Sequence, residues 1–137
     1  MKKLYVLILL FLSFSASAQI QWVTLEEAQL LALKNPKPIF MDFTATWCGW
    51  CKKLDKTTFE EERVVQMLST DYYAVKVNFD DKSSITLGGK SYDTHKELAK
   101  SFGITGLPTM VVYDSEKKKS KTIVGYKNGK ALIRELK

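Results

Sequence analysis

The stretch Thr44–Leu54 reads TATWCGWCKKL and contains both cysteines of the 137-residue chain, Cys48 and Cys51. Two residues separate the cysteines, and a tryptophan precedes each of them. Such a pair can form a structural disulfide, supply half of a metal site, or exchange electrons with other thiols. The choice among these three uses decides which function the sequence predicts.

The composition argues against two of these uses but does not exclude them. A structural zinc site needs four ligands, and the sequence adds to the two thiols a single histidine, His95, which we interpret as a polar surface residue near a helix start. A disulfide between residues three apart closes too small a loop to remove much chain entropy from the unfolded state. Redox exchange is therefore the favoured interpretation.

The position of the cysteine pair also favours redox chemistry. The apolar run Ile39–Thr44 (IFMDFT) predicts a buried strand, and Cys48–Lys56 predicts the helix that follows it. Because the first turn of a helix has unpaired N–H groups and a partial positive charge, it stabilises a thiolate at Cys48 and lowers the pKa of that thiol. Cys51 lies one turn further on the same side, where it can resolve a mixed disulfide of Cys48.

The first eighteen residues, MKKLYVLILLFLSFSASA, have the pattern of a secretory signal peptide with cleavage after Ala18. The apolar run of this segment is shorter than the roughly 20 residues of a membrane-spanning helix, which disfavours the alternative of an uncleaved anchor. We therefore expect an exported protein, periplasmic or secreted, whose single folded domain comprises residues 19–137. Export places the two thiols in an oxidising compartment.

The charge of the chain does not predict a nucleic-acid partner. The formal net charge is +6, and it falls to +4 when Lys2 and Lys3 leave with the signal peptide. The densest basic run, Lys117–Lys119, has no aromatic residues interleaved with it, as a single-strand binding groove would have. We expect this run to be a solvated hairpin tip and the protein to be a monomer.

Helices and strands alternate along the chain. Capping boxes, in which a glutamate follows a threonine by three residues, predict helix starts at Thr24, Thr58 and Thr94. Apolar spacing predicts helices over 25–34, 58–68, 94–103 and 130–136, and strands over 73–79, 109–113 and 121–126. Residues 80–94 are expected to form a loop, or a small hairpin that turns at Gly88–Gly89. This order predicts an α/β fold with a mixed central β-sheet and helices on both faces.

The sequence resembles the thioredoxin family over most of residues 39–136. The segment IFMDFTATWCGWCKKL is similar to the active-site strand and helix of thioredoxins, and VKVNFD at 75–80 is similar to their third strand. FGITGLPT at 102–109 is similar to the helix end and cis-proline loop, and Gly125 falls at a glycine of the last strand. KTTFEEERVVQML at 56–68 is closer to exported members of the thioredoxin-7 or electron-relay type.

This resemblance implies a role for ten residues. Cys48 matches the nucleophile of the family, and Cys51 matches the resolving thiol. Asp42 matches a buried aspartate whose raised pKa lets it accept the Cys51 proton. Lys76 matches the lysine that neighbours this aspartate. For Asp42 the alternative is a solvent-facing position at a strand end, and for Pro108 a trans peptide bond. The expected substrate-binding residues are Trp47, Gly49, Trp50, Leu107, Pro108 in the cis form, and Thr109.

The resemblance also implies a function, with alternatives that the residues leave open. We expect a thiol–disulfide oxidoreductase that reduces protein disulfides, needs no cofactor beyond its cysteine pair, and receives electrons from an upstream donor such as a membrane thiol relay. The alternatives are a disulfide oxidase or isomerase, a non-catalytic binding module, and a metal carrier. Two features depart from the family: Gly-Trp instead of Gly-Pro between the cysteines, and an insertion around Lys82–Thr94 that either reaches toward the substrate face or is a surface loop.

Overall fold

The computed structural model describes residues 18–137. The expected signal peptide, apart from Ala18, lies outside the described residues. Within the part of the chain that the structure describes, no helix combines the length and the apolar character needed to span a membrane.

The centre of the fold is a five-stranded sheet in the order β1-β3-β2-β6-β7. The strands β1, β3 and β2 are parallel, whereas β6 is antiparallel to β2 and β7 is antiparallel to β6. The expected mixed sheet is thus confirmed. The strands are β1 (Trp22–Val23), β2 (Ile39–Thr44), β3 (Tyr73–Asn78), β6 (Thr109–Asp114) and β7 (Lys119–Val124).

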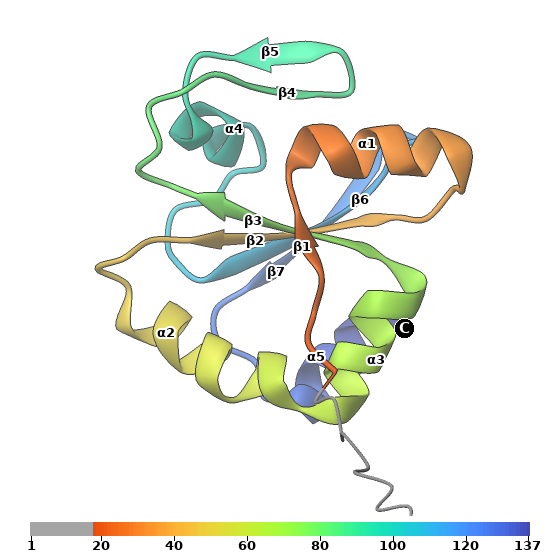
Figure 1. The fold of residues 1–137 in the computed structure, drawn as a ribbon. Helices are drawn as coiled ribbons and strands as arrows, with labels where there is room; N and C mark the ends of the chain where they lie inside the picture. The colour runs from red at the N-terminus through yellow and green to blue at the C-terminus, as the bar shows by residue number, and fades with distance from the viewer. Residues whose placement is uncertain (1–17) are drawn as a thin grey trace, which may run out of the picture.

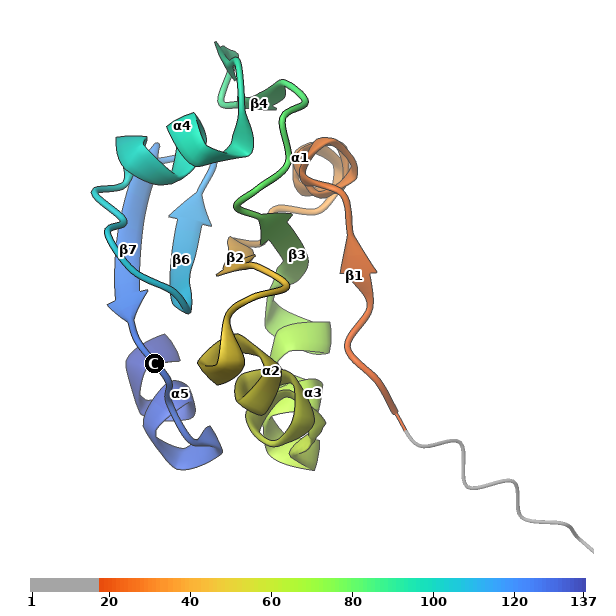
Figure 2. The same cartoon turned by 90° about the vertical axis from the view of Figure 1, so that its left-hand side faces the viewer.

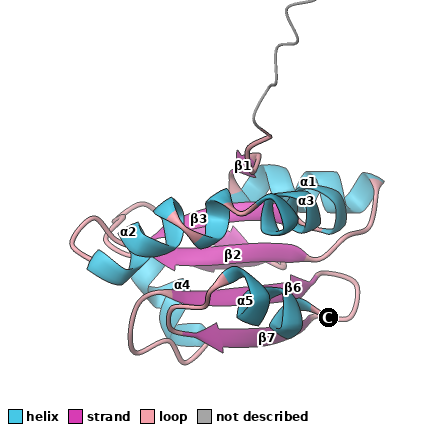
Figure 3. Ribbon diagram, turned by 90° about the horizontal axis from the view of Figure 1, so that it is seen from below, coloured by secondary structure: helices cyan, strands magenta, loops and turns pink. Residues whose placement is uncertain are grey.

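Helices cover both faces of this sheet, as the sequence predicts (Figure 1). The helices α1 (Leu25–Lys34) and α4 (His95–Ser101) lie on one face. The other face carries α2 (Gly49–Lys56), the 3-10 turn η1 (Thr58–Glu60), α3 (Glu62–Asp71) and α5 (Gly129–Leu136). Figures 2 and 3 show the same two layers from the side and from below.

The central strand β2 divides the hydrophobic core into two clusters and sets the position of its one charge. Met41 and Phe43 belong to the cluster under α1 and α4, whereas Phe40 belongs to the cluster under α2, α3 and α5. Because side chains alternate along a strand, Asp42 lies on the same side as Phe40 and therefore faces α2. The continuous apolar run around it is what a strand buried on both faces requires.

Three local predictions were inaccurate. The strand β1 was missed because two residues are too short to carry a pattern. Thr58 does not cap a helix: its hydroxyl is buried and donates to the Lys127 carbonyl at 2.6 Å, and α3 begins only at Glu62. Strand β7 begins two residues earlier than expected, because Lys118 adopts a φ of 51° and closes the turn within the basic run.

The insertion forms a hairpin of β4 (Ile85–Leu87) and β5 (Lys90–Tyr92), which turns at Gly88–Gly89 with φ values of 59° and 82°. The Gln29 side chain of α1 donates to the Thr86 carbonyl at 2.8 Å and accepts from the Gly88 N–H at 2.9 Å. The hairpin therefore lies against α1, on the face opposite to α2, and Leu87 is buried in the core (Figure 1). The insertion is an added part of the core on this face.

A truncation in this hairpin should destabilise the whole domain. Replacing Leu87 by Ala is expected to lower the free energy of unfolding by about 2–3 kcal/mol, because it leaves a cavity under α1 and α4. The exposed neighbour Thr86, replaced by Ala, is the matched control and should cost less than about 1 kcal/mol. Urea unfolding of both variants measures the difference. Equal midpoints would mean that the hairpin is dispensable for the core.

Candidate redox site

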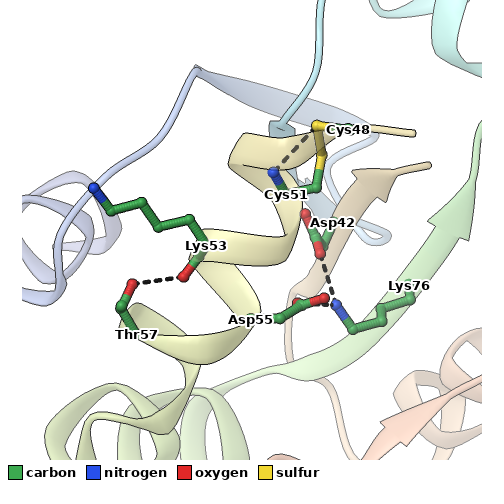
Figure 4. A network of polar contacts seen from close by, with 7 residues as sticks. All are labelled: Asp42, Cys48, Cys51, Lys53, Asp55, Thr57 and Lys76. Carbon is green, nitrogen blue, oxygen red and sulfur yellow. Dashed lines mark hydrogen bonds and ion pairs between the residues drawn. A yellow bond between two sulfur atoms is a disulfide. The ribbon is translucent and has the colours of Figure 1, made fainter. Parts of the chain in front are cut away.

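Cys48 and Cys51 form a disulfide at the start of α2, with their Cα atoms 5.3 Å apart. Cys48 is the N-cap residue of this helix, and its sulfur accepts a hydrogen bond from the Cys51 backbone N–H at 3.1 Å (Figure 4). The Cys51 N–H lies in the first turn of the helix, where it has no carbonyl partner within the helix, and it bonds the sulfur of Cys48 instead. Such a donor stabilises a negative charge on this sulfur after reduction.

The two sulfur-bearing residues differ in their access to solvent. Cys51 is 1% exposed and Cys48 is 6% exposed. Ala45 belongs to the same small cluster, and Phe79 and Leu107 pack against it. Cys48 is therefore the more accessible of the two residues, although both are largely buried.

Asp42 is a buried carboxylate on β2 with a strongly altered acidity. It is 1% exposed, and its Oδ2 atom lies 3.0 Å from the ammonium nitrogen of Lys76 on β3. Burial raises the pKa of Asp42 from 3.8 to about 6, although the positive charge of Lys76 works in the opposite direction. Its Oδ1 atom is buried and has no hydrogen-bond partner among the described residues. Figure 4 shows the side chain between the disulfide and Lys76.

A second carboxylate, Asp55, completes this charge cluster, and the sequence did not predict it. The Lys76 ammonium lies 2.5 Å from Asp55 Oδ1, and the Asp55 side chain is 42% exposed. Burial lowers the pKa of Lys76, but Asp42 and Asp55 together outweigh it, so that this pKa is raised. The available signal was the helical spacing: Asp55 follows Cys51 by four residues and therefore lies on the same side of α2.

The expected substrate-binding residues do not all face the disulfide in the same way. Trp47 is 64% exposed, and its indole N–H donates to Asp80 at 2.7 Å. Trp50 is 57% exposed, Gly49 is exposed, and the Leu107–Pro108 peptide bond is cis, as the resemblance implied. Pro108 and Thr109 are buried, and the Thr109 hydroxyl donates to the Gly106 carbonyl at 2.7 Å.

The basic residues after Cys51 are not both available to the sulfur. Lys53 places its ammonium 4.9 Å from the ring centre of Trp50 and 5.3 Å from that of Tyr126. In Figure 4 its side chain extends away from the disulfide. Lys53 therefore does not face the disulfide, and the donor that contacts the Cys48 sulfur is the Cys51 N–H of α2.

His95 is not the surface residue that the sequence suggested. Its side chain is only 15% exposed, and Nε2 lies 3.9 Å from Asp81 Oδ2. It lines a cavity of about 730 Å³ between α1 and β4, whose lining residues do not include the cysteines. Among residues 18–137, no group of three or more histidine, cysteine, aspartate or glutamate side chains is arranged to hold a metal ion.

Comparisons with known proteins agree with this geometry. Residues 25–137 match the family model of the thioredoxin-like domain. The thiol:disulfide interchange protein DsbD of Campylobacter jejuni (strain RM1221) is 31% identical over 102 residues, which are 74% of this chain but only 16% of that protein. The thioredoxin of Mycobacterium tuberculosis (strain H37Rv) is 32% identical over 104 residues, 76% of this chain and 75% of that protein. The solved structure of a DsbH oxidoreductase has a TM-score of 0.70 and 25% identity, covering 88% of this chain and 84% of that one.

The family match extends from α1 to the last residue, and the structural match establishes the thioredoxin-like fold that the resemblance implied. The two cysteines that the resemblance singled out stand at the start of the helix after the central strand. The chain therefore belongs to the thioredoxin-like domain family.

Proposed function

We propose that this protein is exported and reduces disulfides of other proteins by dithiol exchange at Cys48 and Cys51. The observation that carries the proposal is the position of Cys48, which caps α2 and accepts the Cys51 N–H. This position makes Cys48 the more reactive thiol of the reduced pair. The sequence is 32% identical to a thioredoxin and 31% identical to a DsbD protein over about three quarters of the chain, and this similarity supports the same activity.

The exchange needs two displacements. The Cys48 thiolate attacks one sulfur of the substrate disulfide, forms a mixed disulfide with it, and releases the other substrate sulfur as a thiolate, which takes up a proton. Cys51 then loses its proton, and its thiolate attacks the Cys48 sulfur of the mixed disulfide. This attack forms the intramolecular disulfide and releases the second substrate sulfur as a thiolate, which takes up a proton. The substrate gains two electrons and the cysteine pair loses two.

Asp42 is the residue that we assign to the second displacement. Its carboxylate is buried on the side of the sheet that faces α2, with one oxygen free of hydrogen bonds to described residues. Its pKa of about 6 leaves it mostly ionised at pH 7 and still basic enough to take the Cys51 proton. Lys76 holds the other oxygen and is a positioning residue.

The cellular setting is part of the proposal. The signal-peptide pattern of the first eighteen residues supports export to the periplasm or the exterior. There the oxidised protein needs an electron donor that reduces its disulfide again, and a membrane thiol relay has the required chemistry. Its substrates are proteins with accessible disulfides, and we expect it to act as a monomer.

Insulin reduction tests the activity. With dithiothreitol as the electron source, the wild-type protein should accelerate insulin precipitation, and Cys48→Ser should lower the rate to that of dithiothreitol alone, because the first displacement has lost its nucleophile. Lys34→Ser, on the exposed end of α1, is the control and should match wild type. Equal rates for wild type and Cys48→Ser would favour a binding module with an idle disulfide.

The direction of electron flow needs a separate measurement. Equilibration with glutathione buffers gives the reduction potential of the cysteine pair, and a reductant should lie near thioredoxin, at about −270 mV. A potential near −120 mV would make the protein an oxidant instead. The insulin assay alone does not separate these cases, because dithiothreitol reduces both kinds of protein.

A further inference from the structure

Trp50, which stands where reducing thioredoxins have proline, is held in place by Lys53 of the same helix and by Tyr126 from a distant part of the chain. Its ring centre lies 5.6 Å from that of Tyr126, with the ring planes tilted by 45°. The Lys53 ammonium contacts both rings, at 4.9 Å and 5.3 Å from their centres. The Tyr126 hydroxyl is 3.0 Å from Thr57 Oγ1. We call Trp50, Lys53, Thr57 and Tyr126 the aromatic ledge.

The backbone beneath the aromatic ledge is tied at both ends. The Gly125 N–H, just before Tyr126, donates to the Pro108 carbonyl at 2.9 Å. Just after Tyr126, the Lys127 carbonyl accepts from the Thr58 hydroxyl at 2.6 Å. The aromatic ledge is therefore a fixed surface that adjoins the cis-proline loop, and its Trp50 side chain is still 57% exposed.

The aromatic ledge begins in the same turn of α2 as the disulfide and adjoins the cis-proline loop. Trp47 and Trp50 are 64% and 57% exposed, whereas Cys48 is packed in a small cluster with Ala45. Trp50 is two residues from Cys48 in the first turn of α2. A peptide whose cysteine reacts with Cys48 and whose backbone follows the cis-proline loop brings a flanking residue within reach of Trp50 and Tyr126.

We propose that the aromatic ledge binds the substrate residue next to the target cysteine and favours an aromatic side chain at that position. This proposal rests on the reductase activity proposed above. An aromatic side chain gains attraction from ring–ring geometry in addition to the apolar area it buries. Because Lys53 and Tyr126 already fix the indole, little further ordering is needed when the side chain binds.

The test compares short peptides that contain one cysteine joined to glutathione and a Trp, Ala or Asp next to it. Prereduced protein reacts with each peptide, and chromatography after acid quench gives kcat/KM from the thiol released. Wild type should prefer the Trp peptide over the Ala peptide by roughly 3- to 10-fold. In Trp50→Ala and Tyr126→Ala this ratio should fall toward one. Leu33→Ala, an exposed apolar truncation on α1, should keep the wild-type ratio.

The ratio separates a binding role from a structural one, because a general loss of reactivity lowers both rates together. A wild-type ratio of one, a preference for the Asp peptide, or an unchanged ratio in both ledge variants would overturn the proposal. Failure to reduce any of the three peptides would overturn the proposed reductase function itself. Turnover of all three peptides at equal rates would leave that function standing and reject only the aromatic preference.

Discussion

Asp42→Asn should slow the attack of Cys51 on the mixed disulfide by about a hundredfold at pH 7, because a positioned general base contributes at least that factor. The carboxylate is buried next to α2, and its pKa of about 6 suits proton transfer near neutrality. An amide of the same size cannot accept the proton. In the wild-type protein this step should accelerate as the pH rises through about 6, and the variant should lack that inflection.

Stopped-flow mixing of reduced protein with an aromatic disulfide that releases a coloured thiol separates the two displacements. The first burst reports Cys48, and the second reports Cys51. Only the second should slow in Asp42→Asn, while Asp71→Asn, an exposed carboxylate on α3, should leave both unchanged. If both bursts slow equally, or neither does, Asp42 is not the base for Cys51.

The same burial should make the stability of the domain depend on pH. The pKa of Asp42 is about 6 in the folded protein, whereas an ordinary aspartate, as in the unfolded chain, has a pKa of 3.8. Between pH 3.8 and pH 6 the folded state therefore holds a proton that the unfolded chain has released. The free energy of unfolding therefore falls as the pH rises through this window. The difference between the two pKa values corresponds to about 3 kcal/mol of folding stability. This contribution is fully present below pH 3.8 and lost above pH 6.

Urea unfolding of wild type and Asp42→Asn between pH 3 and pH 8 measures this contribution, because the other titrating groups cancel in the difference. The variant should gain about 3 kcal/mol relative to wild type between the acidic and the neutral end of the range. Asp55→Asn retains Asp42 and should keep the wild-type sign of the slope. A difference that stays constant with pH would mean that Asp42 titrates as an exposed carboxylate does.

Local patterns were sufficient to predict the layout of the site. The run Ile39–Thr44 predicted the central strand because a strand covered on both faces has to be apolar throughout, and the structure buries it in both core clusters. Thr24 and Thr94 cap their helices as expected. The disulfide at the start of α2 and Asp42 on the same side of the sheet then follow from the spacing along the chain.

Contacts between distant segments could not be predicted in this way. Asp55 of α2 contacts Lys76 of β3, and Tyr126, just after β7, contacts Trp50 of α2, only because the fold brings these segments together. Thr58 shows the same limit, since a tertiary hydrogen bond to Lys127 outweighs its local preference to cap a helix. These residues act through partners that sequence spacing does not reveal.

The proposed reaction requires Cys48 to be ionised near neutral pH, because this residue caps α2. Ultraviolet thiolate absorbance of the reduced protein, followed against pH with Cys51→Ala so that only Cys48 titrates, measures this directly. We expect a pKa for this thiol below the ordinary value of about 8.5. A thiolate that forms only at or above that value would contradict it, since the start of the helix would then contribute nothing to the reactivity of the site.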